Sequence, residues 1–124
     1  MFVQSLWIGT ELSNLEILTI KSFIKNNIGF ILYTYKPIVN LPNDVIIKDG
    51  NEILPESEIF AYQTGKGKGS FSAFSNIFRY KLLYDKGGIW VDMDLVCIKY
   101  FELSNPYGFA SEINDQKKSN VASC

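Results

Sequence analysis

The stretch that decides the fold is Gly87-Gly-Ile-Trp-Val-Asp-Met-Asp-Leu-Val96. Its two glycines are suited to end a helix, and the β-branched and aromatic residues after them predict a strand from Ile89 to about Ile98. Two carboxylates, Asp92 and Asp94, interrupt this apolar run. Because alternate side chains of a strand share one face, we expect the two carboxylates to point the same way.

A pair of neighbouring carboxylates in an apolar strand needs a compensating group. Burying an unpaired charge is costly, and two like charges repel unless a cation lies between them. The chain has no histidine, so a metal would rest on oxygen ligands, which suit Mg²⁺ or Mn²⁺. The alternative is a solvated strand end with two incidental acids. Ligands bind at the carboxyl ends of strands in open α/β sheets, which favours the metal site.

The segment before the glycines predicts a helix over residues 70–86, with its phenylalanines on the buried face. The polar residues Ser75 and Asn76 precede Arg79 by four and three positions, so they share another face of this helix with it. An arginine there could fork onto phosphate or sugar oxygens. The alternative is a solvent-exposed arginine that pairs with a nearby acid.

The first half of the chain predicts a parallel α/β sheet. Apolar runs predict strands over residues 2–8, 30–35 and 45–48, and Ser13 and Glu16 form a capping box that begins a helix ending near residues 26–27. The order strand, helix, strand, strand is typical of such a sheet. Trp7 ends the first strand. It could stack on a nucleotide base, although a core position is the more usual role of a tryptophan.

Composition narrows the function classes. A net charge of −1 provides no field that would recruit nucleic acid. The N-terminus does not read as a signal peptide, and no run approaches the ~20 apolar residues of a membrane span. Two cysteines, Cys97 and Cys124, form no disulfide framework and favour a reducing compartment. Residues 65–69, Gly-Lys-Gly-Lys-Gly, lack the strand and the further glycine of a dinucleotide fingerprint, so they predict a surface loop.

The domain organisation reads as one incomplete domain. We expect residues 1–112 to form its folded part and residues 113–124 to be a polar tail that is disordered or truncated. A parallel sheet of this kind usually needs more elements to cover both faces. The chain is therefore expected to be the N-terminal part of a larger fold.

The sequence resembles the DXD-containing sugar transferases. These include fungal initiating mannosyltransferases and bacterial capsule and lipopolysaccharide transferases, with the glucosylating bacterial toxins as more distant relatives. The resemblance extends from residue 3 to about residue 112, and the helix-Gly-Gly-strand-DXD signature is its most specific part. The matching stretches are Gln4–Gly9, Leu12–Glu16, Ser22-Phe23, Leu32–Tyr35, Phe74–Tyr84 and Gly87–Asp94.

The resemblance implies a Rossmann-like GT-A fold that binds a nucleotide sugar. The implied reaction is a retaining transfer from a UDP- or GDP-sugar to a glycan or lipid-linked acceptor, with Mn²⁺ or Mg²⁺ as cofactor. The implied setting is surface polysaccharide synthesis, either in the cytoplasm or at the inner face of the membrane. No catalytic residue is assigned, because a metal-neutralised diphosphate can leave without a protein base.

The resemblance also implies a role for each candidate residue. Asp94 would ligate the metal directly, and Asp92 would contact both the metal and the ribose. Arg79, with Ser75 and Asn76 on the same helix, would hold the donor sugar or its phosphate. Trp7 would stack on the base, which reverses the expectation of a core role.

Two departures from the family pattern keep an alternative open. The family usually has an aspartate where this chain has Asn76, and its catalytic domain continues well beyond residue 124. The alternative is a non-catalytic truncated remnant, or a nucleotide-sugar-binding module without transfer activity. A dinucleotide-binding α/β domain is a third hypothesis, disfavoured by the missing fingerprint.

Overall fold

The computed structural model describes residues 1–61, 69–101, 111–113 and 119–121, which form two helices, six strands and two short 3₁₀ turns. The predicted loop at residues 65–69 lies almost wholly outside these ranges. The elements are β1 (Phe2–Trp7), α1 (Asn14–Lys25), β2 (Gly29–Thr34), β3 (Ile46–Asp49), η1 (Gly50–Glu52), η2 (Glu56–Glu58), α2 (Ser72–Lys86), β4 (Ile89–Trp90), β5 (Ser111–Ile113) and β6 (Ser119–Val121).

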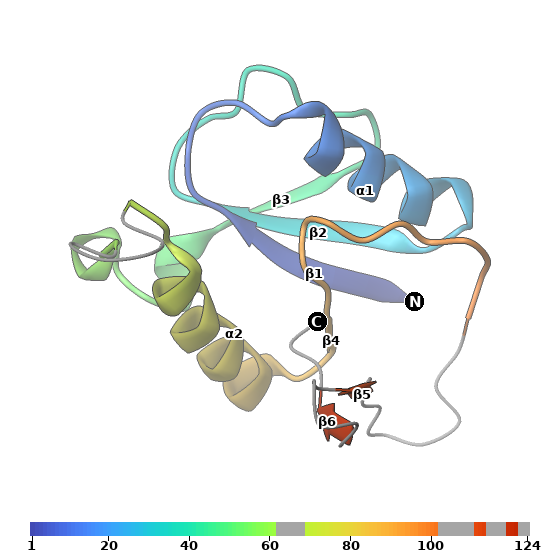
Figure 1. The fold of residues 1–124 in the computed structure, drawn as a ribbon. Coiled ribbons are helices and arrows are strands. Elements are labelled where there is room, and N and C mark those ends of the chain that lie inside the picture. The colour runs from blue at the N-terminus through green and yellow to red at the C-terminus, as the bar shows by residue number, and fades with distance from the viewer. Residues whose placement is uncertain (62–68, 102–110, 114–118, 122–124) are drawn as a thin grey trace.

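The first four strands form one parallel sheet in the order β3-β2-β1-β4 (Figure 1). The register runs along the whole of β1, from Phe2 opposite Gly29 to Trp7 opposite Thr34. Strand β4 pairs only with the beginning of β1, where Val3 lies opposite Ile89. The predicted α/β class with a Rossmann-like parallel sheet is confirmed.

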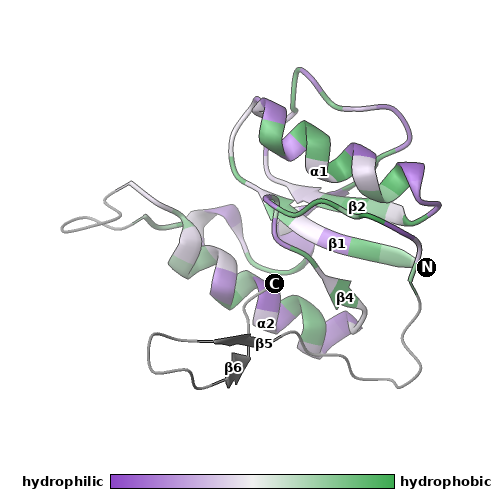
Figure 2. Cartoon of the chain, turned by 45° about the vertical axis from the view of Figure 1, so that its right-hand side comes forward, coloured by the Kyte–Doolittle hydropathy of each residue, from purple (hydrophilic) through white to green (hydrophobic). Residues whose placement is uncertain are grey.

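The two helices cover opposite faces of this sheet (Figure 1). Alternation along β1 explains the two cores, because Val3 packs in the cluster under α1 and Leu6 in the cluster under α2. Hydrophilic and hydrophobic residues alternate around both helices, whereas β2 is largely hydrophobic, as expected of a strand buried on both faces (Figure 2). The α2 core is mainly aromatic: Phe74, Phe78 and Trp90 pack with Tyr33.

Helix α1 begins and ends where the sequence predicts. The Ser13 backbone N–H donates to the Glu16 carboxylate at 3.0 Å, as a capping box requires. Asn26 is the C-cap, and Asn27 follows in the left-handed region with φ 63°. Asparagine tolerates this conformation better than most residues, so the helix stops there.

The turn from α2 into β4 depends on two glycines. Gly87 and Gly88 both have positive φ, 69° and 96°, which favours residues without a Cβ. A Cβ at Gly88 would also collide with the side-chain amide of Gln4. That amide donates to the Gly87 carbonyl at 3.0 Å and so ties the turn to β1.

The strand predicted over Ile89–Ile98 begins at Ile89 as expected, but its predicted length is wrong. Strand β4 ends at Trp90, and a turn follows at Met93 and Asp94. The last bond to the sheet runs from the Val91 N–H to the Gln4 carbonyl at 3.0 Å. The carboxylates therefore follow the strand in a turn, so the strand-based expectation that they share a face no longer applies.

The end of the chain includes a small hairpin. Strands β5 and β6 pair antiparallel, with Glu112 opposite Asn120. Residues 119–121 of the predicted tail are strand.

Candidate functional site

A cavity of about 260 Å³ lies between β1, the start of α2 and the turn after β4. Its lining residues come from all three elements and are Ser5, Leu6, Trp7, Ile8, Phe71, Ser72, Ser75, Trp90, Asp92 and Met93. The cavity thus lies toward the carboxyl ends of β1 and β4, where α/β sheets bind ligands.

The shortness of β4 creates this cavity. Strand β1 continues for three residues beyond Gln4, whereas β4 leaves the sheet after two residues. Within the described chain, the edge of β1 from Ser5 to Trp7 therefore has no strand neighbour on the β4 side. The same feature that contradicts the strand prediction opens a site beside Asp92.

Three of the predicted site residues line the cavity together: Trp7, Ser75 and Asp92. The Trp7 indole N–H donates to the Glu11 carbonyl at 2.9 Å. This bond ties the ring to the loop that follows β1. Asp92 accepts a hydrogen bond of 3.0 Å from the Trp90 indole N–H. This bond holds one of the two carboxylate oxygens of Asp92, Oδ1.

The other three predicted residues, Asn76, Arg79 and Asp94, do not line the cavity. Asn76 is exposed on α2, and Asp94 is exposed on the turn. Arg79 is only 7% exposed, its guanidinium lies 4.9 Å from the Tyr80 ring centroid, and it donates to the Tyr80 hydroxyl at 3.2 Å. The alternative of a solvent-exposed Arg79 is therefore wrong. Arg79 lies one helical turn from Ser75, on the same side of α2.

Helix α1 holds the turn that carries the two aspartates. Thr19 Oγ1 donates to the Met93 carbonyl at 2.9 Å, and the Cys97 N–H donates to Ser22 Oγ at 2.8 Å. The Asn26 amide donates to the Cys97 carbonyl at 3.1 Å. Figure 1 shows this segment, in orange, leaving β4 and running beneath α1. Sequence reasoning missed these three side chains, although polar residues at helical spacing on an apolar face were a visible signal.

A second cavity of about 350 Å³ adjoins the first and shares Ile8 and Phe71 with it. Its remaining lining comes from the loops after β1 and β2 and from the η2 region, and consists of Gly9, Tyr35, Lys36, Glu56 and Ile59. The Tyr35 hydroxyl donates to the Leu54 carbonyl at 2.8 Å. The pKa of Tyr35 is raised to about 12, mainly by burial and to a lesser extent by the carboxylates of Asp49, Glu56 and Glu58. The hydroxyl therefore keeps its proton.

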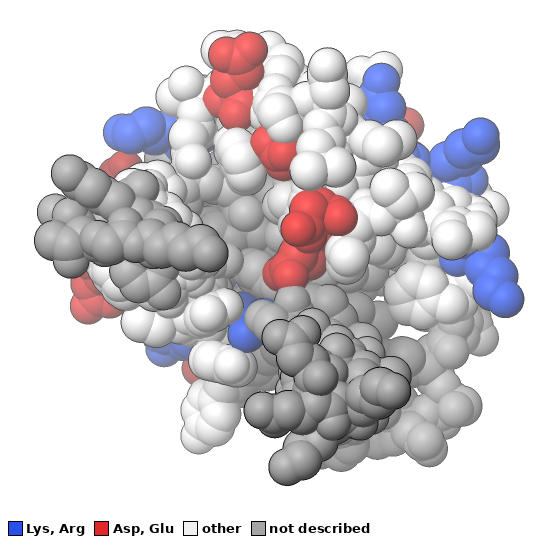
Figure 3. All heavy atoms as spheres, in the orientation of Figure 1, with Lys and Arg blue, Asp and Glu red and all other residues white. Residues whose placement is uncertain are grey.

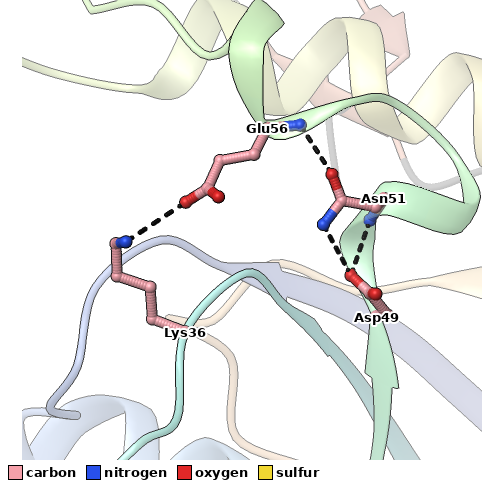
Figure 4. Close-up of polar contacts among 4 residues, drawn as sticks. All are labelled: Lys36, Asp49, Asn51 and Glu56. Carbon is pink, nitrogen blue, oxygen red and sulfur yellow. Dashed lines mark hydrogen bonds and ion pairs between the residues drawn. The ribbon is translucent and has the colours of Figure 1, made fainter.

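A chain of polar contacts shapes the rim of the second cavity (Figure 4). Asp49 accepts two hydrogen bonds of 2.9 Å from Asn51, which hold the pKa of its carboxyl below the ordinary value. The Asn51 side-chain oxygen accepts from the Glu56 N–H at 2.8 Å, and Glu56 pairs with Lys36 at 3.3 Å. The end of β3 thereby positions Glu56 at the start of η2, where it pairs with Lys36 of the loop after β2.

Acidic side chains lie close to a hollow on one face of the molecule (Figure 3). Figure 3 shows acidic side chains along the middle of the face, beside a hollow in the surface, with a cationic side chain below them. Such an arrangement suits a ligand that brings a metal ion to the acids and an anionic group to the cation.

The donor set at the turn suits a hard divalent cation. Asp92 and Asp94 offer carboxylate oxygens, and Mg²⁺ or Mn²⁺ is often held by one or two carboxylates together with phosphate oxygens and water. Within the described ranges, no group of three or more Asp, Glu, Cys or His residues is placed so that it could hold a metal ion.

No helix in the described part of the chain is both long and apolar enough to cross a bilayer.

Comparison with known proteins gives one match. The family model described as a glycosyltransferase sugar-binding region containing a DXD motif matches residues 13–119, which include α1, α2 and the Asp92-Met93-Asp94 turn. No curated protein and no solved structure matches the chain.

Proposed function

The chain belongs to the glycosyltransferase family whose sugar-binding region contains a DXD motif, and from this premise we propose that it is a metal-dependent transferase. The proposed donor is a nucleotide-diphosphate sugar with UDP or GDP as its nucleotide. The proposed reaction is a retaining transfer to a glycan or lipid-linked acceptor. Residues 1–112 would form the donor-binding part of a GT-A domain.

The observation that carries this proposal is the convergence of Trp7, Ser75 and Asp92 on one cavity. These residues come from β1, α2 and the turn after β4, so no single local pattern brings them together. An aromatic ring, a hydroxyl and a carboxylate suit a base, a sugar or phosphate oxygen, and a metal or ribose hydroxyl, in that order. The adjoining second cavity provides room for a ligand longer than the first cavity alone would hold.

The two aspartates would act through a divalent ion. Asp94 would ligate Mn²⁺ or Mg²⁺ directly, and Asp92, oriented by Trp90, would contact the metal and the ribose. When bound, the metal neutralises the charge that develops on the departing diphosphate. Arg79 would stabilise the same diphosphate or the donor sugar, with Ser75 and Asn76 as hydrogen-bonding neighbours on α2.

The biological setting is part of the proposal. We propose a role in the synthesis of a surface polysaccharide such as capsule or lipopolysaccharide, with the chain in the cytoplasm or at the inner face of the membrane. The family relationship to the DXD transferases supports this setting, and the acceptor is the part that experiments must identify.

The test compares two matched aspartate variants. Mn²⁺-dependent hydrolysis of UDP- and GDP-sugars is measured for the wild type, Asp94→Asn and Asp85→Asn. Asp85 is a suitable control because it lies at the far end of α2 in a surface pair with Lys81. We expect Asp94→Asn to lose metal-dependent turnover and Asp85→Asn to retain it. Equal rates in all three proteins would overturn the assigned role of Asp94.

A second candidate function is favoured by Asn76. An amide there can bond a sugar hydroxyl but carries no charge to meet Arg79, so the chain could bind a nucleotide sugar without transferring it. Calorimetric titration with Mn²⁺ and UDP- or GDP-sugars tests this module. Binding without turnover supports it, and a gain of turnover in Asn76→Asp would identify the amide as the cause.

A further inference from the structure

We propose that Thr19 on α1 is a positioning residue for the Asp92-Met93-Asp94 turn, and that the polar stripe Thr19, Ser22 and Asn26 sets the geometry in which the two carboxylates receive a divalent metal. This inference rests on the proposed function for its chemistry. Its structural part depends only on hydrogen bonds between α1 and the segment after β4.

The three side chains are held in place by their own helix. Each donates to a carbonyl three or four residues earlier: Thr19 to Leu15 at 3.0 Å, Ser22 to Thr19 at 2.8 Å and Asn26 to Ser22 at 2.8 Å. Such local bonds restrict the rotamers that a polar side chain can adopt. The side chains of the stripe are therefore held by their own helix as well as by the segment after β4.

The remaining hydrogen-bonding capacity of the stripe faces the segment. Asn26 has two amide hydrogens, one for Ser22 and one for the Cys97 carbonyl. Ser22 uses its oxygen to accept from the Cys97 N–H. The segment after the turn is thus fixed at Cys97 by a donor and an acceptor, which sets where the chain leaves the site.

Thr19 is the member that acts on the turn itself. It is fully buried, and its hydroxyl reaches the carbonyl of Met93, the residue between the two aspartates. Fixing that carbonyl orients the Met93–Asp94 peptide, which carries Asp94 and lies one residue beyond Asp92. The hydroxyl proton lies within hydrogen-bond distance of two acceptors, the Leu15 and Met93 carbonyl oxygens. Ser22 and Asn26 bond the segment at Cys97, whereas Thr19 bonds the turn itself, so Thr19 is the member suited to orient the turn.

The test removes the hydroxyl with the isosteric change Thr19→Val and restores it with Thr19→Ser. The matched control is Asn40→Ala, which removes two bonds to the Leu12 backbone at the start of α1 and none to the turn. Two readouts are used: hydrogen exchange of the amides of residues 93–97, and quenching of Trp7 and Trp90 fluorescence by MnCl₂ with UDP or GDP. Both tryptophans line the cavity, and the chain has only these two.

We expect Thr19→Val to exchange faster at residues 93–97 and to bind the Mn²⁺–nucleotide roughly three- to tenfold more weakly, the worth of one hydrogen bond. Thr19→Ser should recover most of this affinity, and Asn40→Ala should change neither readout at the turn. If Thr19→Val does not fold, Asn26→Ala releases the same segment and takes its place. Unchanged exchange and affinity would overturn the proposal. A wild type that binds no Mn²⁺–nucleotide would instead overturn the proposed function, and the exchange data would still decide whether Thr19 holds the turn.

Discussion

Trp90 connects the hydrophobic core under α2 to the carboxylate of Asp92. Its ring is 6% exposed and packs against Phe78 with centroids 6.3 Å apart, while its indole N–H donates to Asp92. A buried indole N–H usually finds a partner, and here the partner is one of the two carboxylates of the DXD motif. The packing of the α2 core therefore decides which way Asp92 points.

Replacing Trp90 with phenylalanine separates these two roles. Trp90→Phe keeps an aromatic ring in the core but removes the donor to Asp92, so we expect roughly tenfold weaker binding of Mn²⁺ with UDP or GDP. Calorimetry measures the affinity. The control is Phe78→Leu, which perturbs the same core without touching the carboxylate. An equal loss of affinity in both variants would show that packing alone is responsible.

Tyr35 makes the free energy of unfolding sensitive to alkaline pH. Its pKa is about 12 in the folded protein and about 10 in the unfolded chain, because burial and nearby carboxylates disfavour the phenolate. Between these values the unfolded chain loses a proton that the native state keeps, so stability falls as pH rises from 10 to 12. Urea unfolding across this range should show a shallower loss for Tyr35→Phe. Tyr84→Phe, at a side chain that is 91% exposed, is the control and should match the wild type.

At the scale of elements, local patterns predict most of the fold. The capping box, the apolar face of α1 and the glycines after α2 act within a few residues of one another, so the bounds of both helices follow from the sequence. The length of β4 does not, because it depends on competition between two distant partners. The β-forming residues 91–98 could extend the sheet, but α1 binds the backbone at Met93 and Cys97 instead.

In the candidate site, too, the features set by nearby residues could be predicted from the sequence, and those set by distant contacts could not. The paired carboxylates and the Ser75-Asn76-Arg79 pattern are visible in the sequence, and Trp7, Ser75 and Asp92 do meet at one cavity. The cavity itself was not predictable, because it arises from the unequal lengths of β1 and β4. The burial of Arg79 was also missed, since helical spacing alone does not say which neighbours cover a side chain.

The capping box gives a prediction at the start of α1. Ser13→Ala removes the hydroxyl that bonds Glu16 at 2.5 Å, and N-cap replacements of this kind typically cost about 1 kcal/mol. Urea unfolding should show that loss, with an unchanged slope. Ser57→Ala, at an exposed position in η2, should unfold like the wild type. A wild-type midpoint for Ser13→Ala would mean that Glu16 alone holds the N-terminus.

At the scale of the whole molecule, the candidate site lies where several elements meet. Strand β1, helix α2 and the turn after β4 line the cavity, and α1 secures the turn from the opposite face of the sheet. A ligand that bridges these elements stabilises the native state, because the unfolded chain does not bring them together.

Thermal unfolding therefore reports on donor binding. Mn²⁺ together with UDP or GDP, at about a hundredfold excess over Kd, should add roughly 2.7 kcal/mol and raise Tm by roughly 10 °C. Metal alone or nucleotide alone should give a smaller shift, because each completes only part of the site. Asp94→Asn should abolish the joint effect. A full shift in that variant would place the metal elsewhere.

The pairing of β4 with the first residues of β1 has a consequence for synthesis on the ribosome. Ile89 lies opposite Val3, so β1 keeps an open edge until almost the whole described sheet has been translated. At ~5–20 residues per second, that edge waits for seconds after β2 has emerged. Closing so long a loop is slow, and an unpaired strand edge can join another chain. The pairing of β4 with β1 is thus the last to form in this sheet, and it brings the two aspartates that follow β4 to their place beside β1.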